Sequence, residues 1–395
     1  MVKKVFKWIG AILALLILGA FLFGPAQVEK SFNKTLPHAA EAPSARAREL
    51  HRTLLIADLH ADSLLWRRDL LERGTRGHVD VPRLLEGNVA LQAFTIVTKV
   101  PRGQNIESND AGSDVIQPLM ILQVRRFAAW TSLAERALDQ ADRLREFAGK
   151  SDGKLTVITS RAELAGYLAR RERLSAPNRL SDAGITAGFL GVEGAHALEG
   201  DLANLDKLFD AGVRMVSPSH FFDNEFAGSA HGIVKGGLSA LGKQLIQRMQ
   251  AKKMIVDLAH ASPKTFADMI AMATRPVVVS HTGVKGTCDN TRNLSDDQLR
   301  AVAKTGGVIA IGYWDTAVCG TDAKSIARAI RYAANLVGAQ HVALGSDYDG
   351  GNIVPFDASE LVRITEALLA EKFSDADIRL IMGENILRVL RENLP

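Results

Sequence analysis

The sequence predicts an α/β protein, a (β/α)8 TIM barrel with a helical insertion after its second strand and an amino-terminal membrane segment. Its 395 residues, 47% of them hydrophobic, suit either two ordinary domains or one barrel. Eight short apolar segments alternate with amphipathic ones, as parallel strands covered on both faces by helices do. Polar residues of metal-binding type follow most of these segments. The same alternation also fits an open, doubly wound sheet.

The amino terminus carries a membrane signal. Three lysines within the first seven residues precede an unbroken small or apolar run from Trp8 to Phe23. This charge placement predicts that everything after the run lies on the exported side, periplasmic or extracellular. No small-x-small cleavage site precedes Gln27, which favours an uncleaved anchor over a signal peptide, and the lack of any polar face disfavours a buried core helix. We assign residues 1–26 to a signal anchor or transmembrane segment, 27–46 to a polar tether, and 47–395 to the barrel.

The barrel elements are expected in a regular order. The predicted strands are 53–60, 89–97, 186–193, 213–219, 254–260, 276–281, 307–313 and 341–347. The predicted helices between the later strands include 202–209, 241–251, 295–304 and 323–337. A long helical insertion over 113–148, a short strand at 155–159 and a helix at 162–173 separate the second and third barrel strands. A last helix over 375–392 is expected to close the barrel or cover its base.

Charge and cysteine content exclude several classes of protein. The formal charge of +4 comes entirely from residues 1–46, so the barrel is formally neutral. No Lys/Arg-rich run with interleaved aromatic residues is present, and we expect no nucleic-acid partner. The two cysteines, Cys288 and Cys319, form no Cys-x-x-Cys pair, which excludes a zinc ribbon and a thioredoxin motif. They follow neighbouring strands of an exported domain, so a disulfide between them is allowed.

Seven polar side chains lie at the carboxyl ends of predicted strands: His60, Asp62, Glu193, His220, His260, His281 and Asp347. Any one of them alone would be read as a structural polar group or a helix N-cap. In an α/β barrel, however, all strands end at one mouth, where active sites are built, so the seven together predict a site. His341 begins the eighth strand, at the opposite face, and we expect it to be structural.

The ligand types in this set favour zinc. His60 and Asp62 are spaced i, i+2 and point to the same side of a strand, so both can reach one ion. Mixed imidazoles and carboxylates suit zinc or another borderline divalent ion better than calcium. The six expected ligands are His60, Asp62, Glu193, His260, His281 and Asp347. They exceed the needs of one tetrahedral zinc but suffice for two ions if a carboxylate bridges them, which would make a hydrolytic centre.

Motifs spread from about Leu54 to Leu394 resemble the membrane dipeptidase (renal dipeptidase) family of the metal-dependent amidohydrolase superfamily. The matching segments are 56–62 (IADLHAD), 191–196 (GVEGAH), 257–262 (DLAHAS), 279–281 (VSH), 291–296 (TRNLSD), 345–350 (GSDYDG) and 383–389 (GENILRV). Two positions depart from the family pattern. Ala195 stands where a second glycine is usual, and Tyr348 stands where phenylalanine is commoner.

The resemblance implies two zinc ions per chain. It places His60, Asp62 and Asp347 on one ion and His260 and His281 on the other, with Glu193 bridging.

It also implies substrate contacts. His220 would polarise the scissile carbonyl and bind the oxyanion, and Arg292 would hold the free carboxylate of the substrate through its planar fork. Asn224, in the loop after His220, is a further candidate for substrate contact.

The expected activity is that of a binuclear zinc metallopeptidase of the membrane dipeptidase type. Metal-bound hydroxide would attack the amide of a dipeptide, and Asp347 would pass the proton to the leaving amine. The sequence leaves open dipeptides with a D-residue, N-acyl (D-)amino acids, lactam or lactone rings, and a homodimer. A rival of another class is a membrane-tethered binding protein without turnover, which the intact ligand set disfavours.

Overall fold

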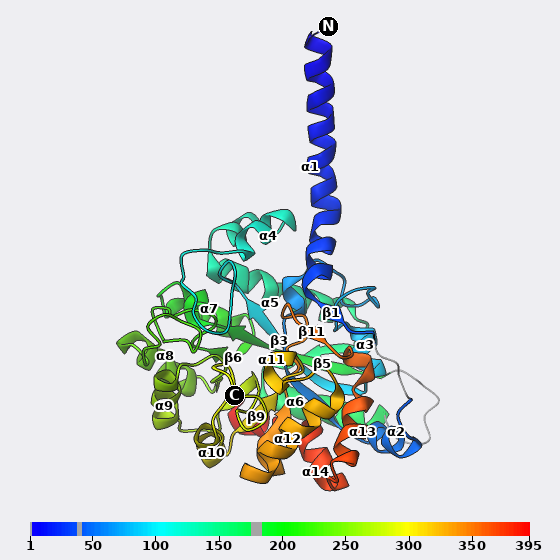
Figure 1. Cartoon of the computed structure of the whole chain (residues 1–395), viewed down its shortest axis with the longest axis vertical. Helices are drawn as coiled ribbons and strands as arrows, with labels where there is room; N and C mark the ends of the chain where they lie inside the picture. Colours follow the sequence, from blue (N-terminus) through cyan, green and yellow to red (C-terminus); the bar gives the residue numbers. More distant parts are fainter. Residues whose placement is uncertain (1, 38–41, 175–183) are drawn as a thin grey trace.

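The computed structural model describes residues 2–37, 42–174 and 184–395 (Figure 1). Eight parallel strands follow one another around a barrel in chain order. They are β2 (Ile56–Ala61), β3 (Val89–Val97), β5 (Thr186–Glu193), β6 (Val213–Ser217), β7 (Ile255–Val256), β8 (Val278–Thr282), β9 (Val308–Ile311) and β10 (Val342–Leu344). A bridge between Asp257 and Val278 joins the two ends of this path. The predicted (β/α)8 barrel is therefore confirmed, and the open sheet is excluded.

Strands β7 and β10 end earlier than the sequence predicted, before the candidate ligands His260 and Asp347. The β7 ladder has two residues, although residues 254–260 were expected to form a strand. His260 has a φ of 61° and Asp347, beyond β10, has a φ of 57°. This left-handed conformation is costly for a residue with a side chain and turns the chain out of the ladder. The backbone at the mouth is thus bent at the residues that the site needs.

Helices cover the outside of the barrel (Figure 1). They are α2 (Ala45–Arg52), α3 (Val81–Glu86), α7 (Ala203–Asp210), α8 (Ala240–Ala251), α9 (Pro263–Met272), α10 (Asp296–Lys304), α11 (Asp315–Val318), α12 (Ala323–Val337) and α13 (Val362–Ala370). Serine or aspartate side chains cap several of them, and Ser295 and Gln298 form a full capping box at α10. The predicted helices of the second half therefore lie within a residue or two of their expected positions.

The insertion is divided where one long helical segment was expected. It forms α4 (Ile116–Leu122), the 3₁₀ turn η2 (Phe127–Trp130) and α5 (Leu133–Lys150). The strand that follows, β4 (Leu155–Val157), pairs with the first residues of β5. Strand β6 pairs with the last residues of β5, so β4 and β6 share one edge of that strand.

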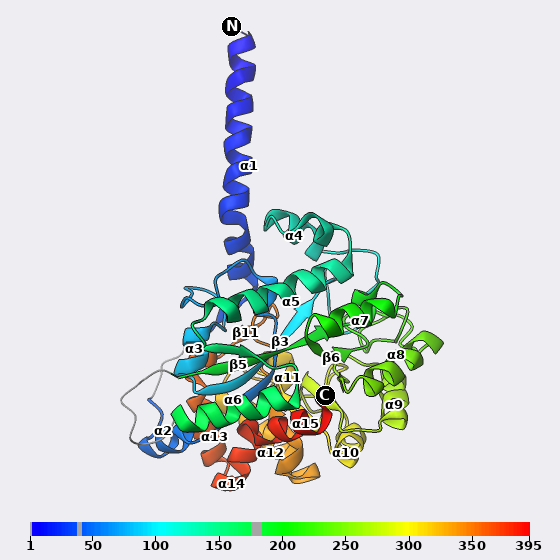
Figure 2. The ribbon, with the colours of Figure 1, turned by 180° about the vertical axis from the view of Figure 1, so that it is seen from behind.

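The base of the barrel is closed by two helices, α6 (Arg161–Leu174) and α15 (Asn385–Asn393) (Figure 2). Leu164 and Tyr167 of α6 and Ile386 and Leu390 of α15 belong to the same apolar cluster as the inward-facing strand residues. The closing helix is kinked, with α14 (Asp375–Arg379) and a π-helical turn (Leu380–Glu384) before α15. Gly383 makes this kink possible, because a Cβ there would lie 1.9 Å from the Leu55 carbonyl oxygen.

The amino terminus is a single helix, α1 (Val2–Phe32), which projects away from the barrel (Figure 1). Its segment Lys3–Phe32 is long and apolar enough to cross a membrane, a test that a signal sequence would also pass. The boundary expected at residue 26 falls inside α1. Beyond it, β1 (Lys34–Thr35) pairs with β11 (Ile353–Val354), so much of the expected tether is packed on the barrel. Tether residues 38–41 lie outside the described residues, and Ser44 caps α2.

The kink at Gly383 generates a stability prediction. Replacing it in the variant Gly383→Ala forces a methyl group against the backbone of β2, and the free energy of unfolding should fall by at least about 2 kcal/mol in denaturant titrations. Gly149→Ala, in α5 with nothing within 4 Å of the added Cβ, should be neutral or stabilise by about 0.5–1 kcal/mol. Equal stability of the two variants would contradict the packing described here.

Candidate functional site

The predicted ligand side chains converge at the carboxyl-end mouth of the barrel. The Nε2 atom of His60 lies 3.5 Å from Asp62 Oδ1, 3.7 Å from Glu193 Oε2 and 3.7 Å from Asp347 Oδ1. These four residues come from β2, the end of β5 and the turn after β10, so the barrel brings together positions almost 300 residues apart in the chain. One imidazole thus faces three carboxylates.

A second group of imidazoles lies against the same glutamate. Glu193 Oε1 is 2.9 Å from His260 Nε2 and 3.3 Å from His281 Nε2, and these two nitrogen atoms are 2.9 Å apart. Its other oxygen, Oε2, is 3.2 Å from His220 Nε2. The carboxylate of Glu193 therefore stands between two sets of ligand atoms, the position that a bridging ligand requires.

Hydrogen bonds orient the two aspartates. Thr95 donates its hydroxyl proton to Asp62 Oδ1 at 2.6 Å, and the Asn352 amide donates to Asp347 Oδ2 at 2.6 Å. In each case one carboxylate oxygen is held, which fixes the direction of the other. Such outer partners preorganise ligands for a metal ion.

The imidazoles are oriented in a similar way. The Ser280 hydroxyl lies 3.2 Å from His60 Nδ1 and 3.0 Å from His281 Nδ1, and the Ser280 backbone N–H donates to buried Asp257 at 2.9 Å. With their Nδ1 atoms engaged by one hydroxyl, both rings present Nε2 to the centre of the site.

Burial shifts the pKa values of the carboxylates and imidazoles in this cluster. Burial raises the pKa of Glu193 well above its usual value and that of Asp347 to about 7. Burial alone would lower the pKa of His60, but the facing carboxylates of Glu193, Asp62 and Asp347 outweigh it and raise this pKa to about 10. Burial lowers the pKa of the remaining imidazoles well below the ordinary value, at His220, His260 and His281. The site thus holds neutral imidazoles beside carboxylates that need positive charge.

This chemistry fits divalent metal ions. Ligand atoms of three overlapping groups lie within 4.8 Å of one another: His60 with His281 and Asp347, Glu193 with His220 and His260, and His60 with Asp62 and Glu193. Two of the atoms that face the centre, His60 Nε2 and Glu193 Oε1, have no hydrogen-bond partner among the described residues. Unpaired buried polar atoms are costly, and coordination to a cation would satisfy them.

Arg292 lies beside the ligands with its side chain buried. Its Nη2 atom donates to the His281 carbonyl oxygen at 2.7 Å and lies 3.5 Å from His260 Nε2, and its guanidinium is 5.6 Å from the Trp314 ring. Among the described residues, no carboxylate lies within 4 Å of this guanidinium. A buried cation without a paired anion is suited to receive one from a ligand.

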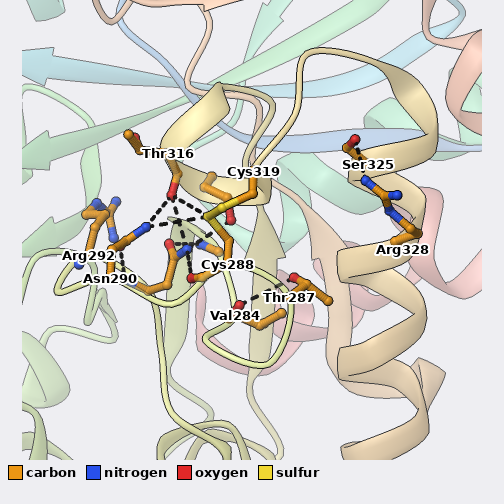
Figure 3. The surroundings of a disulfide bond; sticks show 12 residues. Val284, Thr287, Cys288, Asn290, Arg292, Thr316, Cys319, Ser325 and Arg328 are labelled. Carbon is orange, nitrogen blue, oxygen red and sulfur yellow. Dashed lines mark hydrogen bonds between the residues drawn. A yellow bond between two sulfur atoms is a disulfide. The ribbon is translucent and has the colours of Figure 1, made fainter.

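A disulfide braces the loop that carries Arg292 (Figure 3). Cys288, beyond β8, is bonded to Cys319 at the end of α11, so the bond that the sequence allowed is formed. Across the same junction, the Asn290 amide donates to the Thr316 carbonyl oxygen at 2.7 Å, and the Arg292 backbone N–H donates to Asn290 Oδ1 at 2.9 Å. The position of Arg292 therefore depends on a cross-linked loop.

Two other sequence candidates have structural contacts. Asn224 donates to the Pro218 carbonyl oxygen at 2.8 Å and accepts from the Phe226 N–H at 2.8 Å, so its amide shapes the loop after His220 and does not line the cavity. His341 lies 2.8 Å through Nδ1 from the Gly307 carbonyl oxygen, away from the mouth, as expected.

Sequence reasoning missed two buried histidines near the ligands. The His231 ring centre is 5.1 Å from that of His260, and the His196 ring stacks with that of His220 at 6.4 Å. His231 also lies 2.7 Å through Nδ1 from the Ile106 carbonyl oxygen, which ties the β6–α8 loop to the loop after β3. Neither follows a strand directly, so the pattern that identified the ligands did not reach them.

Arg292 and all the candidate ligands except His60 line a cavity of about 620 Å³. Its walls include Trp314 and Phe221 near the ligands and apolar residues of α1 and α4 farther out. A concave, largely apolar pocket with a few convergent polar groups is typical of an enzyme site.

An α/β barrel with buried imidazoles and carboxylates gathered around one glutamate at its mouth is typical of a metal-dependent hydrolase. Residues 44–394 match the family model of the membrane dipeptidases, peptidase family M19. The chain belongs to this family and is a metallopeptidase of the dipeptidase type.

Solved structures agree in fold. The probable dipeptidase PvdM of Pseudomonas aeruginosa superposes with a TM-score of 0.70 at 21% identity, covering 88% of this chain and 98% of that one. A metallopeptidase of Rhodobacter sphaeroides, liganded with a phosphinate mimic of the dipeptide L-Ala-D-Ala, gives 0.70 at 23% identity, covering 86% and 99%.

Curated relatives match over about half of this chain. A protein of the pqqA 5′ region of Klebsiella pneumoniae is 33% identical over 51% of this chain and 79% of its own length. An uncharacterized dipeptidase of Schizosaccharomyces pombe is 32% identical over 51% of this chain, and the match spans about half of that relative, 52%.

The braced loop generates a prediction for the double variant Cys288→Ser/Cys319→Ser. Opening a loop of 31 residues should lower the free energy of unfolding by about 3–4 kcal/mol. Because Arg292 then moves more freely, KM for a dipeptide should rise about 3–10-fold with little change in kcat. Steady-state kinetics on the dipeptide and on its C-terminal amide provide the check, since the amide lacks the carboxylate and its KM should not change. A shift of KM for both substrates would argue against a specific effect on Arg292.

Proposed function

We propose that the protein is a zinc-dependent dipeptidase that hydrolyses the amide bond of dipeptides at a binuclear site on the exported side of a membrane. The observation that carries this proposal is the carboxylate of Glu193. One of its oxygens faces His60 and His220, and the other faces His260 and His281. A single buried carboxylate shared by two ligand sets is the arrangement expected of a bridge between two ions.

The proposed ligand sets divide at Glu193. His60, Asp62 and Asp347 would hold one zinc ion, and His260 and His281 would hold the other. When bound, two such ions would lower the pKa of a water molecule between them and polarise the scissile carbonyl group. The donor atoms are imidazole nitrogens and carboxylate oxygens, which is the donor set that zinc accepts.

The chain's own residues would complete the reaction. His220, whose pKa is lowered by burial, is a neutral imidazole that can donate a hydrogen bond to the oxyanion as it forms. Asp347, whose pKa burial raises to about 7, can hold the proton taken from water and release it to the leaving amine. The Asn352 amide donates to Oδ2 of Asp347, which holds the carboxyl group in place while Oδ1 faces His60.

Arg292 would fix the substrate by its free carboxylate. The guanidinium is buried, lies beside His260 and His281, and has no carboxylate within ion-pair distance among the described residues. The ligand of the Rhodobacter sphaeroides structure mimics L-Ala-D-Ala, which supports testing dipeptides with a D-residue at the carboxyl end as well as L,L-dipeptides. Hydrolysis of N-acyl amino acids is the second candidate, because it needs the same amide and carboxylate.

The location rests on α1. Within α1, three lysines precede an exposed apolar run that leads to the barrel, which supports an uncleaved anchor with the barrel on the periplasmic or extracellular side. A protease added to intact cells or spheroplasts should reach the barrel only if this orientation is right.

The bridging role predicts a loss of both metal and activity in Glu193→Gln. The neutral amide removes the negative charge shared by both ions, so zinc measured by elemental analysis should fall from about two per chain. The specificity constant kcat/KM for a dipeptide should fall by at least about 10³-fold. His341→Gln, at the far face of the barrel, is the matched control and should keep both. Full activity in a rigorously metal-free preparation would disprove the proposal.

The carboxylate role predicts a selective effect in Arg292→Gln. For a dipeptide, kcat/KM should fall about 30–1,000-fold, as expected when a buried charge pair is lost. For the corresponding dipeptide amide, which has no carboxylate, the change should be less than about threefold. A parallel fall for both substrates would show that Arg292 supports the ligands and does not hold the carboxylate.

A further inference from the structure

The barrel contacts α1 at the level where the apolar run ends. Arg67 donates from Nη1 to the Phe21 carbonyl oxygen at 3.1 Å, and Leu122 of α4 lies 3.2 Å from the position that a Cβ on Gly24 would take. The exposed helix before Phe21 spans roughly 25 Å at about 1.5 Å per residue, most of a hydrocarbon core of about 30 Å. If α1 crosses a membrane, no spacer separates the bilayer from the barrel.

Glu29 holds the end of α1 against the mouth of the barrel. It is 1% exposed and pairs with Arg68 at 2.8 Å and with Arg76 at 2.6 Å. Arg68 also pairs with Asp349, two residues beyond the ligand Asp347. The last turns of α1 therefore have a fixed position relative to the site.

The segment α4–η2 exposes apolar side chains beside α1. Val124 is 62% exposed and Phe127 is 75% exposed, and Arg126 lies next to them in the chain. Figure 1 and Figure 2 both show α4 alongside α1, on the side of the barrel from which α1 emerges. Exposed aromatic and aliphatic side chains next to an arginine are typical of a segment that contacts a bilayer interface.

The cavity has an apolar wall built by these same elements. A small cluster, separate from the two main cores, contains Leu65, Trp66, Val97, Ile116, Leu119 and Met120, and Val28 of α1 packs against it. All of these residues except Met120 line the cavity, together with Phe32 at the end of α1.

Charged side chains are confined to the other end. The acidic residues that line the cavity are the proposed ligands Asp62, Glu193 and Asp347, and the one arginine is Arg292. A substrate that fills the cavity therefore meets charged groups only around its amide and carboxylate. The rest of the lining is mostly apolar and includes four uncharged polar side chains, those of Gln104, Asn105, Thr316 and Asn352.

Resting on the proposed function, we propose that the substrate is an amphiphile supplied by the bilayer, whose acyl side carries an extended apolar chain. Its carboxylate lies at Arg292, its amide lies at the ligands, and its chain lies along the wall made by α1 and α4. Hydrolysis breaks the amide C–N bond; water supplies OH to the acyl carbon and H to the nitrogen, which yields a chain-bearing acid and a free amino acid. The cavity of about 620 Å³ is in the range of pockets that enclose ligands much larger than a dipeptide of small residues.

A matched pair of dipeptides tests whether the site prefers a substrate with a long alkyl chain. Alanylglycine and 2-aminodecanoylglycine share the amide and the carboxylate and differ only in the alkyl chain. With the full chain in lipid nanodiscs, kcat/KM should be at least tenfold higher for the long-chain substrate. Equal values would overturn the inference and leave the proposed function intact, whereas hydrolysis of neither substrate would overturn the proposed function itself.

Two surface variants test whether the alkyl chain of the substrate lies along the wall that contains Phe32. Phe32 is 53% exposed at the cavity wall, so Phe32→Ser should fold normally and should lower kcat/KM for the long-chain substrate at least threefold more than kcat/KM for alanylglycine. Val234→Ser, at a residue 78% exposed and outside the cavity lining, is the control and should change neither. An unchanged preference in Phe32→Ser would overturn the assignment of the wall.

A third variant tests supply from the bilayer. Phe127 lies outside the cavity lining, and Phe127→Asp should lower kcat/KM for the long-chain substrate in nanodiscs at least threefold while alanylglycine is hydrolysed as before. An unchanged rate for the long-chain substrate would overturn the role of the bilayer.

Discussion

The structure depends on the cost of burying Glu193 between Asp62 and Asp347. Carboxylates a few ångströms apart in a buried site repel one another, and burial raises the pKa of Glu193 and of Asp347. The facing carboxylates raise the pKa of His60 to about 10, so a protonated His60 offsets part of their negative charge. Two divalent ions would balance the rest. The surrounding strands and turns hold these groups together in a buried position.

The barrel meets that need by closing on itself. The bridge from Asp257 to Val278 completes the ring of strands, and Asp257 also accepts the Ser280 N–H beneath the imidazoles. The left-handed conformations of His260 and Asp347 store strain at the mouth, which the packed ring beneath them can sustain. A rigid support is what allows ligands from separate strands to keep distances of 3 to 4 Å.

The mouth is shaped by parts of the chain that are not barrel strands. The disulfide between Cys288 and Cys319 braces the Arg292 loop on one side. The end of α1 and helix α4 form an apolar wall of the cavity, and buried Glu29 anchors the end of α1 through Arg68 and Arg76. The cavity thus has polar candidate ligands in one part of its lining and an apolar wall formed partly by the amino-terminal helix in another.

The sequence by itself determined the barrel, the apolar amino-terminal helix and the candidate ligand set, because strand and helix periodicity are local and the candidate ligands lie at the ends of strands or soon after them. His60 and Asp62 could be paired from their spacing alone. Only the tertiary structure decided that Asn224 shapes a loop, that the cysteines are bonded, and that Val28 and Phe32 line the cavity. These features arise from packing between segments far apart in the chain, and no local pattern of hydrophobicity or charge encodes which distant surface a side chain will meet.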